Sequence, residues 1–388
     1  MDLRAQAEHL RDALRAAQRV IERPYQDAFL LPHESRLGLA VSGGLVSPSR
    51  PIAVATVAAD GELPTEPLVI PRRMLAEYLA TLQGECRLRL EGQRVILACG
   101  RSQAAFATAV AEPLPLGIGE TSAEVVVPAE RSGCIADVSF AAARDDVRPA
   151  LQYVWLIGNM AIGVDGYRLA AAPLGVETPC PIPVLPRPAS QARGNDLRAC
   201  LGEHGIRYEV GQLLVVDHAP AVSPPPVQDV MERARQAATL ARATVPTKRL
   251  VKAMRAAARA NYDGLAYLYI APGLVRLVAV TSWPEGEDDA LQADVDTETE
   301  GSGWAAFTPA YLADALSTGE AATIALGQPA EAAVIEAGGV MHVVMPRAVS
   351  HMVRPPAPAN ADAPGRDHAR LENRVAGAGA DRQQGGAE

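Results

Sequence analysis

Hydrophobic positions in the first part of the chain alternate between a helical spacing and a strand spacing. Apolar residues three or four positions apart predict one helix over residues 10–21 and a second over residues 71–82. Between and after these helices, short apolar runs predict strands, and residues 86–100 predict a hairpin. In that hairpin Leu88 and Leu90 alternate with charged side chains, as expected for a strand with one buried face.

The same order of elements recurs twice. A second unit opens with a predicted strand at 123–130 and a helix at 132–144, and a weaker helix is predicted over residues 187–202. A third unit opens with a helix at 247–260 and has its second helix at 308–318. Such a repeat predicts a chain built from three similar domains.

The predicted domain boundaries follow from this repeat. Units of roughly 110–120 residues have the usual size of a domain. We expect the first domain at residues 1–119, the second at 120–243 and the third at 244–353. Residues 354–388 are rich in Pro, Ala, Gly, Asp and Arg and are expected to form a disordered tail.

Composition excludes several classes of protein. Of the 388 residues 48% are hydrophobic but only 4% are aromatic, which predicts aliphatic cores. The five cysteines form no CxxC pair, so neither a disulfide framework nor a metal site is expected, and no cofactor is implied. The amphipathic N-terminus lacks the apolar core of a signal peptide and no apolar run is long enough to cross a membrane, so a cytoplasmic location is expected.

Four segments carry a resemblance to a known family. They are VRPALQYVWLI (147–157), VDGYRLA (164–170), GWAAFTPAYLADAL (303–316) and HVVMP (342–346). In this order and spacing the sequence resembles the bacterial DNA polymerase III beta subunit, the sliding clamp, as a divergent member. The resemblance implies an α+β fold of three repeated clamp domains in a ring-forming crescent, with helices lining a pore and antiparallel sheets outside.

The resemblance also implies a function without catalysis. A clamp is a processivity factor that encircles double-stranded DNA irrespective of sequence. Its implied partners are the DNA polymerase III alpha subunit, the clamp loader, other clamp-motif proteins and a second copy of itself in a homodimer ring. The alternative is an accessory or mobile-element clamp-like protein that binds clamp partners without forming a stable ring around DNA.

Basic residues are concentrated on the helices that the resemblance assigns to the pore. A net charge of -9 argues against a protein that coats DNA with its whole surface, but not against one basic face. On the first helix Arg11, Arg15 and Arg19 form one stripe because they are four residues apart. Arginine on an amphipathic helix is more often simply solvated, and only its recurrence on several helices favours contact with DNA phosphates. The expected pore residues are Arg11, Arg15, Arg19, Arg23, Arg72, Arg73, Arg144, Arg193, Arg198, Lys248, Arg249, Lys252 and Arg255.

A peptide-binding groove between the second and third domains is a further implication of the resemblance. An adaptable Met and aliphatic walls suit the apolar anchors of a linear peptide, although without the resemblance core packing is the favoured explanation of the same strings. The chain departs from the family in carrying Tyr167 where His is common and in continuing past Met345 and Pro346. The expected groove residues are Arg148, Leu151, Val164, Tyr167, Leu169, Pro246, Val343, Met345 and Pro346.

The ring interface is expected between an edge strand of the first domain and the third domain of another copy. Arg101 and Phe106 are the candidate residues in the first domain, with Phe106 as an apolar anchor. Ala258 and Arg259 are the candidates on the facing side, where the family commonly has larger aliphatic residues. The small residues predict a weaker or rebuilt interface.

An enzyme is the third possibility. The sequence has no nucleotide-binding glycine loop, no GxSxG and no HExxH. Cys134 or Cys200 as a nucleophile, or His218 as a base, would require these side chains to converge in one cleft. No catalytic residue is predicted.

Overall fold

The structure is a computed structural model that describes residues 1–22, 24–43, 51–144, 147–218, 222–260, 264–281 and 289–348. These residues form seven α-helices and four sheets in which all paired strands are antiparallel, which confirms the predicted α+β class. Residues Met1–Arg347 make one compact unit. None of the helices in these ranges is long and apolar enough to cross a membrane.

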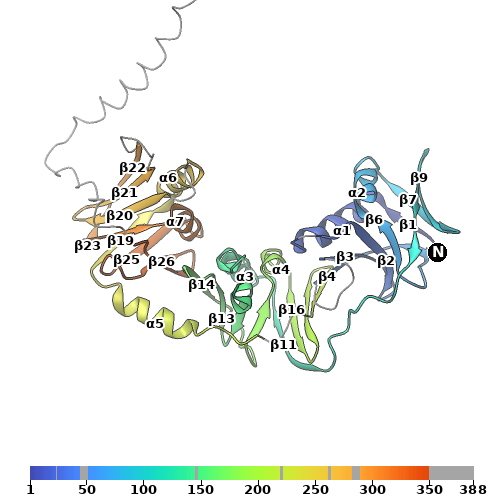
Figure 1. Cartoon of the computed structure of the whole chain (residues 1–388), viewed down its shortest axis with the longest axis horizontal. Helices are drawn as coiled ribbons and strands as arrows, with labels where there is room; N and C mark the ends of the chain where they lie inside the picture. The colour runs from blue at the N-terminus through green and yellow to red at the C-terminus, as the bar shows by residue number, and fades with distance from the viewer. Residues whose placement is uncertain are drawn as a thin grey trace, which may run out of the picture. The chain divides into compact units, whose positions relative to one another are not determined.

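The elements fall into three successive modules of similar content (Figure 1). In the first module, helix α1 (Ala7–Val20) buries Leu10, Leu14 and Ala17 because they recur every three or four residues. The second helix is α2 (Arg72–Ala80). The strands are β1 (Asp2–Gln6), β2 (Asp27–His33), β3 (Arg36–Ser42), β4 (Ile52–Val57), β5 (Asp60–Glu62), β6 (Leu68–Pro71), β7 (Glu85–Glu91), β8 (Arg94–Cys99), β9 (Ser102–Ala107) and β10 (Ala109–Val110).

The second module has two short helices, α3 (Gly133–Val138) and α4 (Pro186–Ser190), and two short 3-10 helices, η1 (Ser139–Ala141) and η2 (Pro149–Gln152). Its strands are β11 (Thr121–Val127), β12 (Val154–Ile157), β13 (Met160–Val164), β14 (Arg168–Pro173), β15 (Ile182–Val184), β16 (Leu197–Gly202), β17 (Gly205–Val210) and β18 (Leu213–Asp217).

The third module has helices α6 (Thr247–Ala260) and α7 (Pro309–Leu316), which pack against each other. Its strands are β19 (Ala241–Pro246), β20 (Leu265–Ala271), β21 (Leu274–Thr281), β22 (Asp289–Asp296), β23 (Thr299–Gly301), β24 (Gly303–Phe307), β25 (Ala321–Leu326), β26 (Ala333–Ala337) and β27 (Val340–Val344). The division into three domains stays a prediction, and its expected boundary at 243/244 falls inside β19.

Two sheets continue from one module into the next. In the order β10-β6-β2-β3-β4-β18-β17-β16-β11, the pairing of β4 with β18 joins the first module to the second. In the order β15-β12-β13-β14-β27-β26-β25-β19-β23, the pairing of β14 with β27 joins the second to the third. Backbone hydrogen bonds therefore cross both junctions. The remaining sheets, β5-β1-β7-β8-β9 and β22-β21-β20-β24, belong to the first and third modules.

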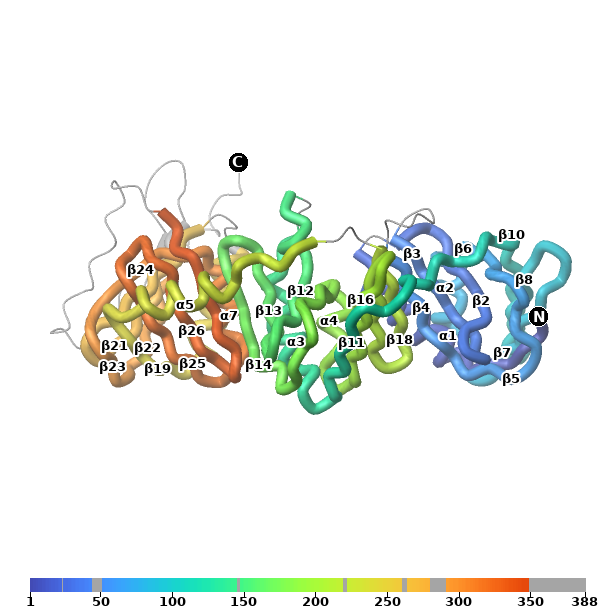
Figure 2. The backbone as a smooth tube through the Cα atoms, turned by 90° about the horizontal axis from the view of Figure 1, so that it is seen from below, coloured from blue at the N-terminus to red at the C-terminus, as the bar shows by residue number. Residues whose placement is uncertain are grey.

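The two connectors between modules each cover one of these junction sheets. Residues 111–120 place Leu114 and Ile118 in an apolar cluster with β2, β3, β4, β16 and β18. The second connector contains helix α5 (Val227–Ala237), which lies across the sheet near β13 and β26 in both overall views (Figure 2).

Several predicted elements differ from the structure. The N-terminal helix is preceded by strand β1, and the helix expected at 132–144 ends at Val138 and continues only as η1. The helix expected over 187–202 is wrong beyond Ser190, because from Leu197 onward the residues form strand β16. Helix α5 was not predicted, and the expected tail at 354–388 lies outside the described residues.

Candidate functional site

The groove expected from the sequence centres on the pairing of β14 with β27. Leu169 lies opposite Val343 in the ladder, and directly opposed residues project from the same face of a sheet. Tyr167 and Met345 are two residues away along each chain and so belong to that face. The Met345 N–H donates to the Tyr167 carbonyl oxygen at 2.9 Å. Residues from two modules are thus brought together.

The turn before β14 holds Arg148 in place. One guanidinium nitrogen of Arg148 donates to the Asp165 carbonyl oxygen at 2.7 Å. Gly166 has a φ of +91°, so the turn favours glycine at this position. A Cβ there would lie 2.2 Å from the Arg148 guanidinium, which would have to move aside. The rest of the guanidinium is exposed at the rim of the groove.

Of the other expected groove residues, three lie near the β14–β27 pairing and one does not. Val164 pairs with Leu169, Leu151 lies in η2 with its N–H donating to the Arg148 carbonyl oxygen, and Pro346 follows Met345. Pro246 is not part of this group. It ends β19 opposite Ala321, and β26 and β25 separate β27 from β19 in the sheet.

Burial divides the expected groove residues into two groups. Tyr167 is 60% exposed and Met345 43% exposed, so the half at the turn is open. Leu169 and Val343 are each only 2% exposed, because Val227, Met231 and Ala234 of α5 share their apolar cluster. The sequence analysis missed this covered half because it did not predict α5.

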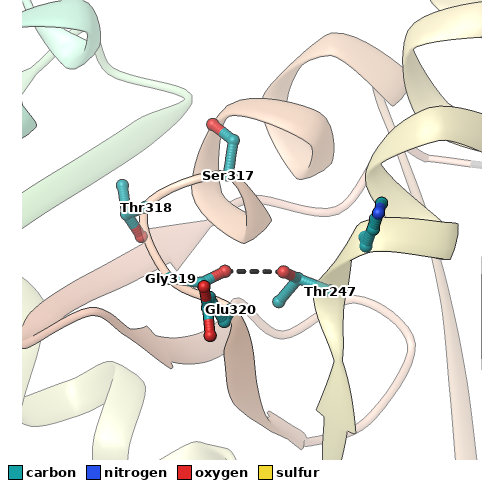
Figure 3. Close-up of a pocket in the computed structure, with 6 residues that line it drawn as sticks. Thr247, Ser317, Thr318, Gly319 and Glu320 are labelled. Carbon is teal, nitrogen blue, oxygen red and sulfur yellow. Dashed lines mark hydrogen bonds between the residues drawn. The ribbon is translucent and has the colours of Figure 1, made fainter.

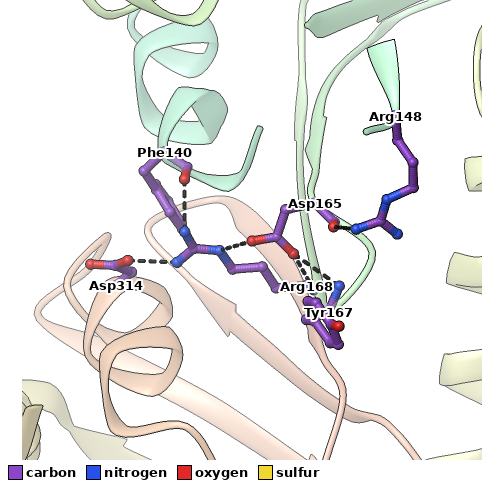
Figure 4. A network of polar contacts seen from close by, with 6 residues as sticks. All are labelled: Phe140, Arg148, Asp165, Tyr167, Arg168 and Asp314. Atoms are coloured by element: carbon purple, nitrogen blue, oxygen red, sulfur yellow. Dashed lines mark hydrogen bonds and ion pairs between the residues drawn. The ribbon is translucent and has the colours of Figure 1, made fainter. Parts of the chain in front are cut away.

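The opposite face of the same ladder carries a partly buried ionic network around Arg168 (Figure 4). The guanidinium donates to Asp165 Oδ2 at 2.9 Å, to the Phe140 carbonyl oxygen at 2.9 Å and to Asp314 Oδ2 at 2.6 Å. Asp314 belongs to α7, so Arg168 joins the second and third modules. It also lies 4.5 Å from the centroid of the Tyr311 ring, a cation–π contact. Neither Arg168 nor Asp314 was among the expected site residues.

The expected DNA-contacting residues on the first two helices are partly neutralised. Arg11 and Arg15 both approach Asp12, at 3.9 and 4.0 Å, and Arg73 pairs with Glu77 at 2.9 Å. Arg72 donates to the Tyr25 carbonyl oxygen at 2.6 Å, while Arg19 is exposed. These helices therefore offer phosphate less free charge than the sequence stripe suggests.

Helix α6 retains its positive charge. Its exposed side chains include Lys248, Arg249, Lys252 and Arg255, and none of the ion pairs among the described residues involves them. Leu250 and Met254 face the core instead, which fixes the basic side chains on the solvent side. Among the expected pore helices, α6 is the clearest candidate for contact with phosphates.

Three expected pore residues of the second module lie outside regular helix. Arg144 is exposed beyond η1, and Arg193 pairs with Asp137 from a turn after α4. Arg198 is in β16 and donates to Glu124 on β11 at 2.9 Å, a bond that lowers the pKa of Glu124. Since its neighbours Leu197 and Ala199 face the core beneath the helices, Arg198 points to the other side of the sheet. Its assignment to a pore helix is wrong, and Arg23 lies outside the described residues.

Two free sheet edges are candidates for the ring interface. Strand β9 ends one sheet and β22 ends another. Phe106, the expected apolar anchor, is only 3% exposed, and its ring centroid lies 6.1 Å from that of Tyr78. Arg101 is exposed beside β9, and the partly buried Ala258 and exposed Arg259 lie at the end of α6, which packs on β21 and β22. The sequence analysis had not identified β22 as a free edge.

A hollow in the third module is lined by polar groups that already hold one another (Figure 3). Thr247 Oγ1 donates to the Gly319 carbonyl oxygen at 2.6 Å, and the Thr247 N–H donates to the Glu320 carbonyl oxygen at 2.9 Å. These bonds fasten the start of α6 to the turn after α7. The hollow is a structural joint, and we assign it no ligand.

The residues of the enzyme hypothesis are held in unreactive settings. Burial raises the pKa of the Cys134 thiol to about 11 and also raises that of Cys200. The two cysteines belong to different apolar clusters. The ring nitrogens of His218 lie 2.8 Å and 2.7 Å from the carbonyl oxygens of His204 and Pro115, so His218 ties the first connector to the second module. No group of metal-ligating side chains occurs in the ranges that the structure covers.

Comparisons with known proteins bear on the fold. No protein-family model and no curated protein matches the sequence. Solved structures do match along 90% of this chain and 100% of their own. They include the DNA polymerase sliding clamp of Pseudomonas aeruginosa (21% identity, TM-score 0.72), the DNA polymerase III beta subunit of Thermotoga maritima (16%, 0.73) and the sliding clamp of Bacillus subtilis (15%, 0.71). The chain therefore has the fold of the bacterial DNA polymerase III sliding clamps.

Proposed function

We propose that this protein is a DNA sliding clamp, a processivity factor that encircles duplex DNA without catalysing a reaction. The observation that carries the proposal is the meeting of Tyr167, Met345 and Arg148 across the β14–β27 junction, in a chain with the clamp fold. Exposed apolar side chains beside an exposed arginine suit a short linear peptide. The proposed partners are the polymerase alpha subunit, the clamp loader and other proteins with a clamp-binding motif.

The proposed DNA contact rests on α6. Lys248, Lys252 and Arg255 are exposed and carry no acidic partner among the described residues. Contacts of this kind read phosphate and not base sequence, as sliding requires, and they weaken with salt because counterions are released.

Retention on circular DNA tests encirclement. After loading onto a nicked circular duplex by the host clamp loader, the protein should stay bound through gel filtration at high salt. Linearising the circle should release most of it, because a ring slides off an open end. Retention is measured with labelled protein in the DNA-containing fractions.

Reversing the charge of basic residues on α6 tests whether this helix contacts DNA. Changing Lys248, Lys252 and Arg255 to glutamate should reduce the loaded amount at least about tenfold, since each lost phosphate contact lowers affinity. Changing Arg233 and Arg235 on α5 to glutamate should leave it unchanged. Equal retention on circular and linear DNA would mean ordinary binding and would contradict the proposal.

The groove makes a separate prediction about partner proteins. The change Met345→Asp should weaken binding of the polymerase alpha subunit at least about tenfold, because it places a charge where an apolar anchor docks. Met74→Asp is the control, since Met74 is 57% exposed on α2, away from the groove. Surface plasmon resonance with immobilised alpha subunit measures both. Equal affinities for the two variants would place the binding surface elsewhere.

An accessory clamp-like protein without a stable ring is the second candidate. It is favoured by the burial of Phe106, because the exposed side chains of β9 are then all small or polar. They are Ser102, Gln103, Ala105 and Ala107. Such an edge offers little apolar area to a partner strand. Light scattering separates the candidates: a dimer at micromolar concentration supports the ring, and a persistent monomer supports the accessory function.

A further inference from the structure

We propose that helix α5 is a removable cover over the inner half of the peptide groove, and that the apolar side chains of a partner peptide take its place. This inference rests on the proposed function, because it describes how access to the same groove is controlled. The structure itself supplies the reason: half of the apolar stripe formed by β14 and β27 is open, and the other half lies under α5.

The stripe is continuous beneath the helix. Leu169 and Ala171 of β14 lie opposite Val343 and Met341 of β27 and point to the same face. Tyr167 and Met345 lie just outside these strands, and a backbone hydrogen bond joins them. Exposure falls from 60% at Tyr167 to 2% at Leu169, within two residues. A peptide anchored at the open end would therefore meet α5 at its next apolar side chain.

Apolar contacts hold α5 on the stripe. Val227, Met231 and Ala234, spaced by four and three residues, form its buried face, and Met231 lies in one cluster with Met341. Two flexible thioether side chains at this contact can repack around different occupants. The same surface can thus accept α5 or the side chains of another chain.

The polar groups of α5 add little to its attachment. Arg233 Nε donates to the Asp229 carbonyl oxygen and Gln236 Nε2 donates to Glu232 Oε1, both within the helix. Among the residues described, α5 side chains form no ion pair with the sheet, and Pro226 provides no side-chain cap. Leaving the sheet would therefore strand no buried charge.

The strands on both sides of α5 are held by pairings that do not involve it. The preceding strand β18 is paired with β17 and β4, and the following strand β19 is paired with β25 and β23. An isolated helix of eleven residues is marginal in water, so α5 should unfold when it leaves the sheet while both ends stay anchored. The connector can therefore open locally while the strands on both sides of it stay folded.

Hydrogen exchange measured by mass spectrometry on the full-length protein tests removal directly and needs no partner. In the wild type, amides of α5 should exchange at least about 100-fold faster than those of β14 and β27, because only a local opening exposes them. The change Met231→Ser should accelerate exchange in α5 by a further tenfold or more, since it removes the central apolar contact. Exchange in β14 and β27 should not change.

Arg235→Ser is the matched control. Arg235 is exposed on the same helix, and Arg and Met have similar helix propensity, so both changes cost the helix alike while only one removes a docking contact. The control should leave α5 exchange within about threefold of the wild type. If α5 exchanged together with β14 and β27, or if both variants behaved alike, α5 would be a fixed part of the fold and the inference would fail.

A binding measurement then tests whether α5 and a partner protein compete for the same apolar surface. The polymerase alpha subunit should bind Met231→Ser several-fold more tightly than the wild type or Arg235→Ser, because no cover has to be displaced. Equal affinities for all three would overturn the competition. Absence of any binding, with α5 opening as expected in the exchange experiment, would instead contradict the proposed function and the proposed occupant while leaving the removable helix established.

Discussion

Replacing Arg168 by methionine is expected to lower the free energy of unfolding by about 3 kcal/mol, because it removes one partner of a largely buried ionic network. Arg168 is 11% exposed, and Asp165, which it contacts at 2.9 Å, is 14% exposed. Without the guanidinium, the Asp165 carboxylate and the Phe140 carbonyl oxygen lose a donor in a place that water reaches poorly. The contact with Asp314 that joins the second and third modules is lost as well. Urea denaturation measures the effect.

Arg148→Met is the control for this experiment. Arg148 contacts the same turn through the Asp165 carbonyl oxygen, but it is exposed, so its loss should cost less than about 1 kcal/mol. Arg168→Lys should fall in between, since an ammonium keeps the charge but cannot make the forked contacts. Equal stability of the Arg168→Met and Arg148→Met variants would show that the network does not hold the modules together.

His342 is expected to make stability strongly dependent on pH below 6.5. Burial, and then the positive charge of Arg168, lowers the pKa of His342 from 6.5 to about 4. The unfolded chain therefore takes up the proton at higher pH than the folded one. The stabilisation is complete above pH 6.5, is lost progressively as the pH falls from 6.5 to 4, and amounts to roughly 3 kcal/mol.

His342→Gln isolates this contribution from that of the carboxylates. Glutamine does not titrate but can still reach Thr318 Oγ1, which lies 3.0 Å from the His342 ring nitrogen. Urea denaturation of both proteins at several pH values should give stability curves that converge by roughly 3 kcal/mol between pH 6.5 and 4, with the wild type losing more. Parallel curves would mean that folding does not lower the pKa of His342.

The long, strongly periodic elements were predictable from the sequence. The helix at 247–260 has the predicted bounds, because five basic and several apolar side chains separate cleanly onto two faces. The grouping of Tyr167 and Leu169 with Val343 and Met345 came from the family resemblance, since no local pattern reveals which segments become neighbours when more than 170 residues separate them. The same limit explains why the contact between Arg168 and Asp314 was missed.

Other errors had a signal in the sequence. Val227, Val230, Met231 and Ala234 show the spacing of a helix, although three consecutive prolines precede them. Alternation around Arg198 is typical of a strand, and the expectation of a repeated helix obscured it. Alternation alone does not identify the buried face, so Phe106 was assigned to the surface although it faces the core.

The ladders that cross both junctions mean that the modules, although similar, are not separable building blocks. A fragment ending before β19 would lack β27, so β14 would stay paired only with β13 and become the open edge of its sheet. Such an open apolar edge is a template for aggregation. Gene truncation or limited proteolysis at either connector should therefore yield insoluble fragments, and any recombination of modules between related chains would have to preserve matching edges on both sides of the cut.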